Sequence, residues 1–320
     1  MKYKYKVIIL LLIFIVLFNP FSLKYFSEHI DSEFYKKNFL FGNDYSIIKG
    51  HGENINSDEI NSLKDSNVEW KNLDFDTNYY PYYGMLSDNE KVVYKQVYAN
   101  AEKVTSTFKP AVDIYIDGVK NVLEAIYDDH PELFWLDTSY SYKYTDDDKV
   151  VQIELNFNKT VSDLEKHKKI FNDAANKIIN KAKKLDSDYA KEKYVYDKLV
   201  SSIEYDKDSE MNQSAYSALV NKKTICAGYT RAFQYILIKL SIPTYYVVGI
   251  ADVTHAWNMV KLDNEYYNVD LTWGISNSSR YKYFNRTDSY YSSNHTRTGL
   301  SIDLPECDGK KYMYKSKRKW

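Results

Sequence analysis

The sequence predicts an α+β fold in which a helix bearing Cys226 packs on an antiparallel sheet bearing His255 and Asp270. Two patterns support this class. After the cysteine, apolar residues recur with the spacing of one helix face, at Phe233, Ile236, Leu237 and Leu240. Farther along the chain, two apolar runs flank a dipeptide typical of tight turns, Asp263-Asn264.

We expect Cys226 in the first turn of this helix, with Thr224 as the N-cap. The free N–H groups and the dipole of a helix N-terminus stabilise an anion, so they favour a reactive thiolate. The small residues Ala227 and Gly228 leave room for a substrate. A buried structural cysteine is the alternative, because free cysteines are often buried.

The hairpin pairs a strand over residues 256–262 with a strand over 265–273, and Val247-Val248 begins an earlier strand. A two-residue turn places Leu262 opposite Glu265, and this register brings His255 and Asp270 out on the same face as diagonal neighbours, roughly 7–8 Å apart at the backbone. A three-residue loop would separate them. Taken singly, either residue could be structural, although aspartate is disfavoured inside strands.

The strings C-A-G-Y-T-R-A-F, H-A-W-N and V-D-L-T-W resemble the transglutaminase-like superfamily, whose fold is related to papain-like thiol proteases. The resemblance covers roughly residues 160–315 and is closest to bacterial surface members. It implies an exported thiol acyltransferase or hydrolase that acts on glutamine side-chain amides or peptide bonds. Its catalytic residues would be Cys226, His255 and Asp270, with a thioester acyl-enzyme as intermediate.

The resemblance also makes the Tyr216 hydroxyl a candidate oxyanion donor. Trp257 and Trp273 are candidates for the walls of the cleft, and ordinary core aromatic residues are the alternative. Acyl transfer of this kind requires no metal and no cofactor, and the expected partner is a protein or peptide substrate, with cell-wall or surface material as one option. The downstream segment around His295 also resembles this family, although less specifically than the three strings above.

Two other functions stay open. The chain could be a surface binding module that keeps the fold without activity. It could also be a papain-like cysteine peptidase, although Gln213 lies far upstream of Cys226 for the oxyanion glutamine of that class.

The N-terminus predicts export. Lysines precede an apolar run at Val7–Phe18, which is typical of a signal peptide. No clear cleavage site follows, and extension to Leu23 gives about the minimum length of a spanning helix, so 1–23 is a signal peptide or a signal anchor. We therefore expect an extracytoplasmic protein, either secreted or attached to the membrane by this segment.

The remainder divides into a polar spacer at 24–78, an α+β region at 79–158 and a transglutaminase-like catalytic domain at 159–320. Within the α+β region, Ser87 and Glu90 predict a capping box at the start of a helix. The other expected elements are a helix at 117–128, strands at 139–144 and 150–157, and helices at 161–185 and 188–203.

Composition excludes several functions. The net charge of −1 gives no general reason to expect nucleic-acid binding, and the chain has no P-loop, G-x-G-x-x-G, H-E-x-x-H or C-x-x-C motif. Its two cysteines form no disulfide framework. A Cys226–Cys307 disulfide would silence the enzyme, and a buried free Cys307 is the preferred expectation.

Overall fold

The computed structural model describes residues 48–56, 58–276 and 280–314. The expected signal peptide or anchor and much of the polar spacer lie outside these residues. Within the described part, no helix combines the length and apolarity needed to cross a membrane. The α+β class is confirmed, with helices packed against largely antiparallel sheets.

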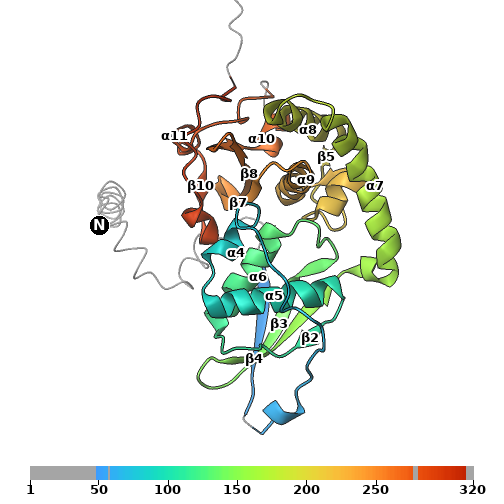
Figure 1. The fold of residues 1–320 in the computed structure, drawn as a ribbon, viewed down its shortest axis with the longest axis vertical. Coiled ribbons are helices and arrows are strands. Elements are labelled where there is room, and N and C mark those ends of the chain that lie inside the picture. Colours follow the sequence, from blue (N-terminus) through green and yellow to red (C-terminus); the bar gives the residue numbers. More distant parts are fainter. Residues whose placement is uncertain (1–47, 57, 277–279, 315–320) are drawn as a thin grey trace, which may run out of the picture. The chain divides into compact units, whose positions relative to one another are not determined.

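The first sheet belongs to the N-terminal region and has the strand order β1-β3-β4-β2. Strands β3 (Leu136–Tyr144) and β4 (Val150–Phe157) form an antiparallel hairpin, as expected. The short β2 (Thr107–Phe108) extends it on one side. Helices α5 (Asp88–Glu102) and α6 (Ile116–Asp129) pack against each other beside this sheet (Figure 1).

Two local predictions in this region have clear outcomes. The capping box at α5 is confirmed, because Ser87 accepts from the Glu90 amide while the Glu90 carboxylate accepts from the Ser87 amide. Part of the segment expected to be a polar spacer forms a strand. Its residues Lys49–Asn54 form β1, which pairs in parallel with the edge of β3. All six residues are exposed, so no apolar alternation marks this strand.

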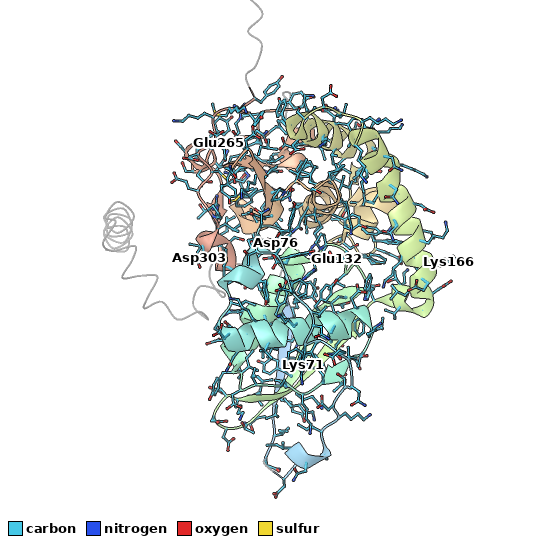
Figure 2. All side chains as sticks on the ribbon, in the orientation of Figure 1. Lys71, Asp76, Glu132, Lys166, Glu265 and Asp303 are labelled. Carbon is cyan, nitrogen blue, oxygen red and sulfur yellow. The ribbon has the colours of Figure 1, made fainter. Side chains whose placement is uncertain are left out.

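The second region begins with two long helices. Helix α7 (Leu164–Ala182) follows a short 3₁₀ turn, η2 (Lys159–Asp163), and leads to α8 (Asp188–Ser202). Figure 2 shows Lys166 on the outer side of α7. The opposite face of α7 carries its buried residues, which are Phe171, Ala175, Ile178, Ile179 and Ala182.

Helix α9 (Cys226–Lys239) packs against strands β7 (Thr244–Ala251) and β8 (Val253–Leu262) of the second sheet, whose order is β10-β7-β8-β9. Its edge strands are β9 (Glu265–Val269) and β10 (Thr296–Arg297). Short elements complete the described part: η1 (Ile60–Ser62), α4 (Pro81–Met85), β5 (Glu204–Tyr205), η3 (Ser217–Asn221), β6 (Lys223–Thr224), α10 (Leu271–Ser276), α11 (Asp288–Tyr291) and η4 (Gly299–Asp303).

The β8–β9 hairpin has the predicted register, with Leu262 opposite Glu265 and Asn258 opposite Val269. Asp263 and Asn264 both have positive φ, 48° and 67°, as a two-residue type I′ turn requires. The expected strand over 265–273 is too long, because β9 ends at Val269 and α10 begins at Leu271.

The two regions share one continuous apolar core. Polar side chains also join them. Tyr82 of α4 donates to the carbonyl of Tyr246 in β7, and Gln234 of α9 donates to the carbonyl of Asp128 at 2.7 Å. All the described residues belong to one compact unit. The expected boundary at residue 159 therefore stays a prediction.

Candidate active site

Cys226 is the first residue of α9, as predicted. The N-cap is Ile225, which has no capping side chain, so the assignment of Thr224 as N-cap is wrong. Thr224 lies in β6, where its hydroxyl donates to the carbonyl of Asn212. The Ile225 amide donates to the same carbonyl at 3.1 Å. The loop around Asn212 thereby fixes the segment that leads into the cysteine.

Gly228 allows this loop to lie against the start of α9. A Cβ at this position would lie 1.8 Å from the Thr224 hydroxyl oxygen and 2.9 Å from the carbonyl oxygens of Asn212 and Ser214. Two of these three contacts are with backbone, which cannot move away cheaply. Glycine is therefore required for the packing that positions Cys226.

His255 and Asp270 are in direct contact. The distance from His255 Nε2 to Asp270 Oδ2 is 2.8 Å, and both side chains are almost fully buried. The other carboxylate oxygen, Oδ1, accepts the backbone N–H of Trp273 at 2.9 Å. Asp270 thus acts as the N-cap of α10, a position that aspartate favours.

The electrostatics of this pair are strongly coupled. Burial lowers the pKa of His255, but the Asp270 carboxylate and the Cys226 thiol outweigh burial and raise this pKa to about 10. Burial raises the pKa of Asp270, but His255, His295 and the Trp273 N–H outweigh it and hold this pKa well below its usual range. Both shifts favour the charged forms, an imidazolium and a carboxylate, and His255 also interacts with the Cys226 thiol.

The other expected site residues have different surroundings. Trp257 lies in β8 and Trp273 in α10, and each ring centroid is 6.2 Å from that of His255. Trp273 therefore reaches the site from a helix and not from a strand. Tyr216 is different, because its hydroxyl bonds His167 Nδ1 at 2.8 Å and its ring packs against Phe134.

His295 was not among the expected site residues, yet it contacts Asp270. It follows α11 and precedes β10, far from the hairpin in sequence. No periodicity or turn signal marks it. Ligand-type atoms of His255, Asp270 and His295 lie within 4.8 Å of one another. Hydrogen bonds from both rings to one carboxylate oxygen account for this closeness, so we assign no metal site to them.

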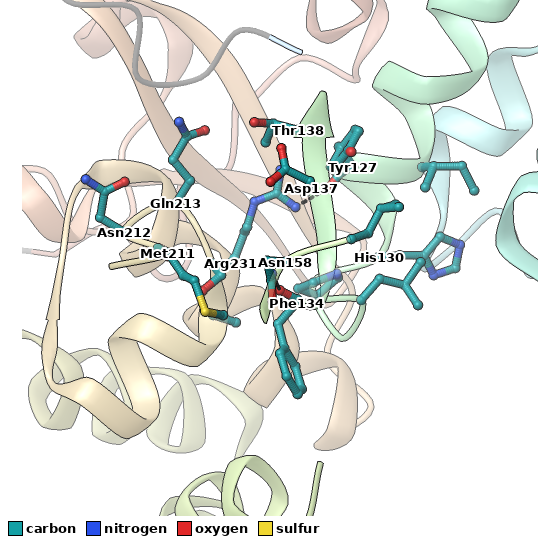
Figure 3. A pocket seen from close by; sticks show the side chains of 16 residues that line it. Tyr127, His130, Phe134, Asp137, Thr138, Asn158, Met211, Asn212, Gln213 and Arg231 are labelled. Carbon is teal, nitrogen blue, oxygen red and sulfur yellow. Dashed lines mark hydrogen bonds between the residues drawn. The ribbon is translucent and has the colours of Figure 1, made fainter. Parts of the chain in front are cut away.

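Two cavities adjoin these elements. One, of about 240 Å³, lies between the end of α6 and the loop before η3, and Gln213 lines it (Figure 3). Figure 3 also shows Arg231 of α9 extending into it toward Tyr127. The other cavity, of about 340 Å³, is lined in part by Trp257 and His295. Both cysteines are free and buried, as preferred for Cys307.

Comparison with known proteins supports the resemblance seen in the sequence. Residues 172–271 match the transglutaminase-like superfamily. No curated protein matches the chain. A crystal structure of a TGase is 19% identical with a TM-score of 0.30, and the match covers 52% of this chain and 50% of the TGase. A candidate cysteine protease from Cytophaga hutchinsonii is 22% identical with a TM-score of 0.28, covering 31% and 37% of the two chains.

The chain thus spans half or less of each of these solved structures. The matched segment 172–271 runs from within α7 to the first residue of α10. It contains α9, both long strands of the second sheet, and the three residues Cys226, His255 and Asp270. The similarity to the transglutaminase-like superfamily therefore lies in the segment that brings these three residues together.

Proposed function

We propose that this protein is an exported thiol acyltransferase or hydrolase that acts on glutamine side-chain amides or peptide bonds. The observation that carries the proposal is the buried hydrogen-bonded pair of His255 and Asp270 beside a cysteine at a helix N-terminus. An adjacent imidazolium and free helical N–H groups both favour the thiolate. Its acyl donor would be a protein or peptide outside the cytoplasm.

In the first half-reaction, the Cys226 sulfur attacks the amide carbonyl carbon and forms a C–S bond. The C–N bond then breaks, and His255 gives its proton to the departing ammonia or amine. Asp270 holds the ring in the orientation that this transfer needs. The backbone N–H of Cys226 is the proposed donor to the developing oxyanion. For the Tyr216 hydroxyl to be a second donor, it would have to exchange its bond to His167 for one to the substrate.

In the second half-reaction, neutral His255 takes a proton from water or from a primary amine as that nucleophile attacks the thioester. The C–S bond breaks and the Cys226 thiolate returns. Water gives hydrolysis or deamidation, and an amine gives transamidation. The buried position of the pair keeps bulk water from competing for the proton.

The test compares wild type with Cys226→Ala on a panel of glutamine-containing peptides, with and without a primary amine, by mass spectrometry of the products. We expect turnover in wild type and a loss of at least about 10³-fold in the variant, because the nucleophile is gone. Cys307→Ala is the matched control and should keep full activity, since Cys307 is buried elsewhere. Equal activity of Cys226→Ala and wild type would contradict the proposal.

A further inference from the structure

Two histidines donate to one oxygen of Asp270. His295 Nε2 lies 3.2 Å from Asp270 Oδ2, the same atom that His255 Nε2 contacts at 2.8 Å. With the Trp273 N–H on Oδ1, the carboxylate has three donors. His295 lies outside the family match, which ends at residue 271, so the match assigns it no role.

The His295 ring is held rigidly. Its side chain is fully enclosed, and the rings of Tyr291, Trp273 and Trp257 lie 4.3, 4.7 and 5.0 Å away between centroids. Its backbone N–H donates to the carbonyl of Tyr291 at 2.8 Å. An enclosed polar ring with fixed neighbours has one stable orientation, and in that orientation Nε2 points at Asp270.

The far side of the ring is also paired. His295 Nδ1 lies 2.7 Å from Asn294 Oδ1, while Asn294 Nδ2 donates to the Tyr283 hydroxyl at 2.9 Å. With Asn294 in this orientation, both partners of the ring are acceptors. Nε2 is the donor in the contact with Asp270, because an ionised carboxylate can only accept. In either charge state, a donor at Nε2 withdraws negative charge from the oxygen that His255 uses.

We propose that His295 is a positioning residue of this site. It fixes the orientation of the Asp270 carboxylate and weakens the stabilisation that this carboxylate gives to protonated His255. Its meaning for catalysis rests on the acyl-transfer function proposed above. This weakening matters because His255 must lose its proton to act as a base in the second half-reaction. A histidine bound too strongly to its carboxylate would stay protonated and resolve the thioester slowly.

Other titratable groups around the cluster are few. The Cys226 thiol faces His255, and Tyr196 and Tyr291 face Asp270. Burial and the Asp270 charge raise the pKa of both tyrosines, so they stay neutral when His255 titrates. Tyr283 contacts Asn294 and its ring lies 5.6 Å from that of His295. A substitution at His295 should therefore change mainly the titration midpoint of His255.

The experiment follows the side-chain nitrogen signals of His255 by ¹⁵N NMR from pH 6 to 11, in the full protein without substrate. His255→Gln assigns the signal among six histidines. In His295→Leu, which removes the donor, we expect the His255 midpoint to rise by about half a pH unit or more. His295→Gln keeps an N–H near the Nε2 position and should restore at least half of the shift. His51→Gln, on the exposed β1, should leave the midpoint unchanged.

An unchanged midpoint in His295→Leu would overturn the proposal, whether or not the enzyme turns over. If His295→Leu does not fold, Asn294→Leu replaces it. This variant removes the Nδ1 acceptor and should move the midpoint upward by a smaller amount, and no movement would overturn the proposal. Absence of acyl transfer in wild type, with the midpoint shifted as expected, would defeat the proposed function alone.

Discussion

At the scale of single residues, the site is organised by one buried carboxylate. Asp270 closes β9, caps α10 and orients His255, so one side chain determines backbone and chemistry together. Burial of an isolated charge is costly, and this charge is tolerated because it has three donors. The carboxylate that orients the His255 ring is thus also a structural element of the fold.

A second buried carboxyl, Glu192 of α8, shows the opposite behaviour. Burial raises its pKa to about 8, and the Asn285 amide, which donates at 3.0 Å, only partly offsets this. Glu192 Oε1 and Asn285 Oδ1 have no partner among the described residues. If Oε1 is protonated it can donate to Oδ1, closing a carboxylic acid–amide pair with two hydrogen bonds.

This arrangement predicts that Glu192→Gln stabilises the protein at alkaline pH. The folded pKa of Glu192 lies above the unfolded value of about 4.3, so its contribution to stability falls as pH rises from about 4.3 to about 8. A glutamine makes the same pair without titrating. In urea unfolding, the stability of the variant relative to wild type should increase by about 1–3 kcal/mol between pH 5.5 and pH 9. Equal pH dependence would contradict a protonated Glu192.

At the scale of elements, the start of α9 depends on close backbone packing. Gly228→Ala should place a methyl group against the Asn212 and Ser214 carbonyls and push the 212–214 loop away from Cys226. We expect a loss of about 1–3 kcal/mol in the free energy of unfolding, with lower kcat. Gly84→Ala in α4 is the matched control, because its new Cβ would meet only one side chain, at 3.1 Å. A Gly228→Ala protein with unchanged stability and kcat would refute this packing role.

The elements differ in how well the sequence predicts them, for physical reasons. The β8–β9 register follows from a two-residue turn and from alternation, which are both local, and it was predicted. The predicted strand runs past the end of β9 because the sequence pattern includes Asp270 in the strand, whereas its side chain is a helix N-cap. Strand β1 has no apolar side to bury, and it is held by backbone pairing with β3 and by exposed polar contacts of Glu53 with Lys143 and of Asn54 with Asp146.

The site shows the same division. Cys226, His255 and Asp270 lie in segments whose local pattern indicates a helix start and a hairpin, so their meeting could be inferred. His295 reaches Asp270 through α11 and the turn after it, held by contacts distant in sequence. Residues placed by long-range packing alone leave no periodic signal. The Tyr216 hydroxyl likewise forms a hydrogen bond with His167, which lies in α7, and no local sequence pattern indicates this contact.

At the scale of the whole molecule, the two regions should unfold together. Gln234 and Arg231 of α9 donate to the last carbonyls of α6, at Asp128 and Tyr127, and both regions share a core. We expect one calorimetric transition. Gln234→Leu, which leaves a buried carbonyl unpaired, should lower the stability of that single transition by about 1–3 kcal/mol. Lys166→Ala, on the outer side of α7, is the control and should change little. Two separate transitions would show independent domains.

The indole rings beside the two histidines have a practical consequence. Trp257 and Trp273 lie within ring-contact range of both His255 and His295. A protonated imidazole quenches the emission of a neighbouring indole, whereas a neutral imidazole quenches it less. The protein therefore carries a built-in fluorescence reporter of the charge on His255, readable in ultraviolet light without any attached dye.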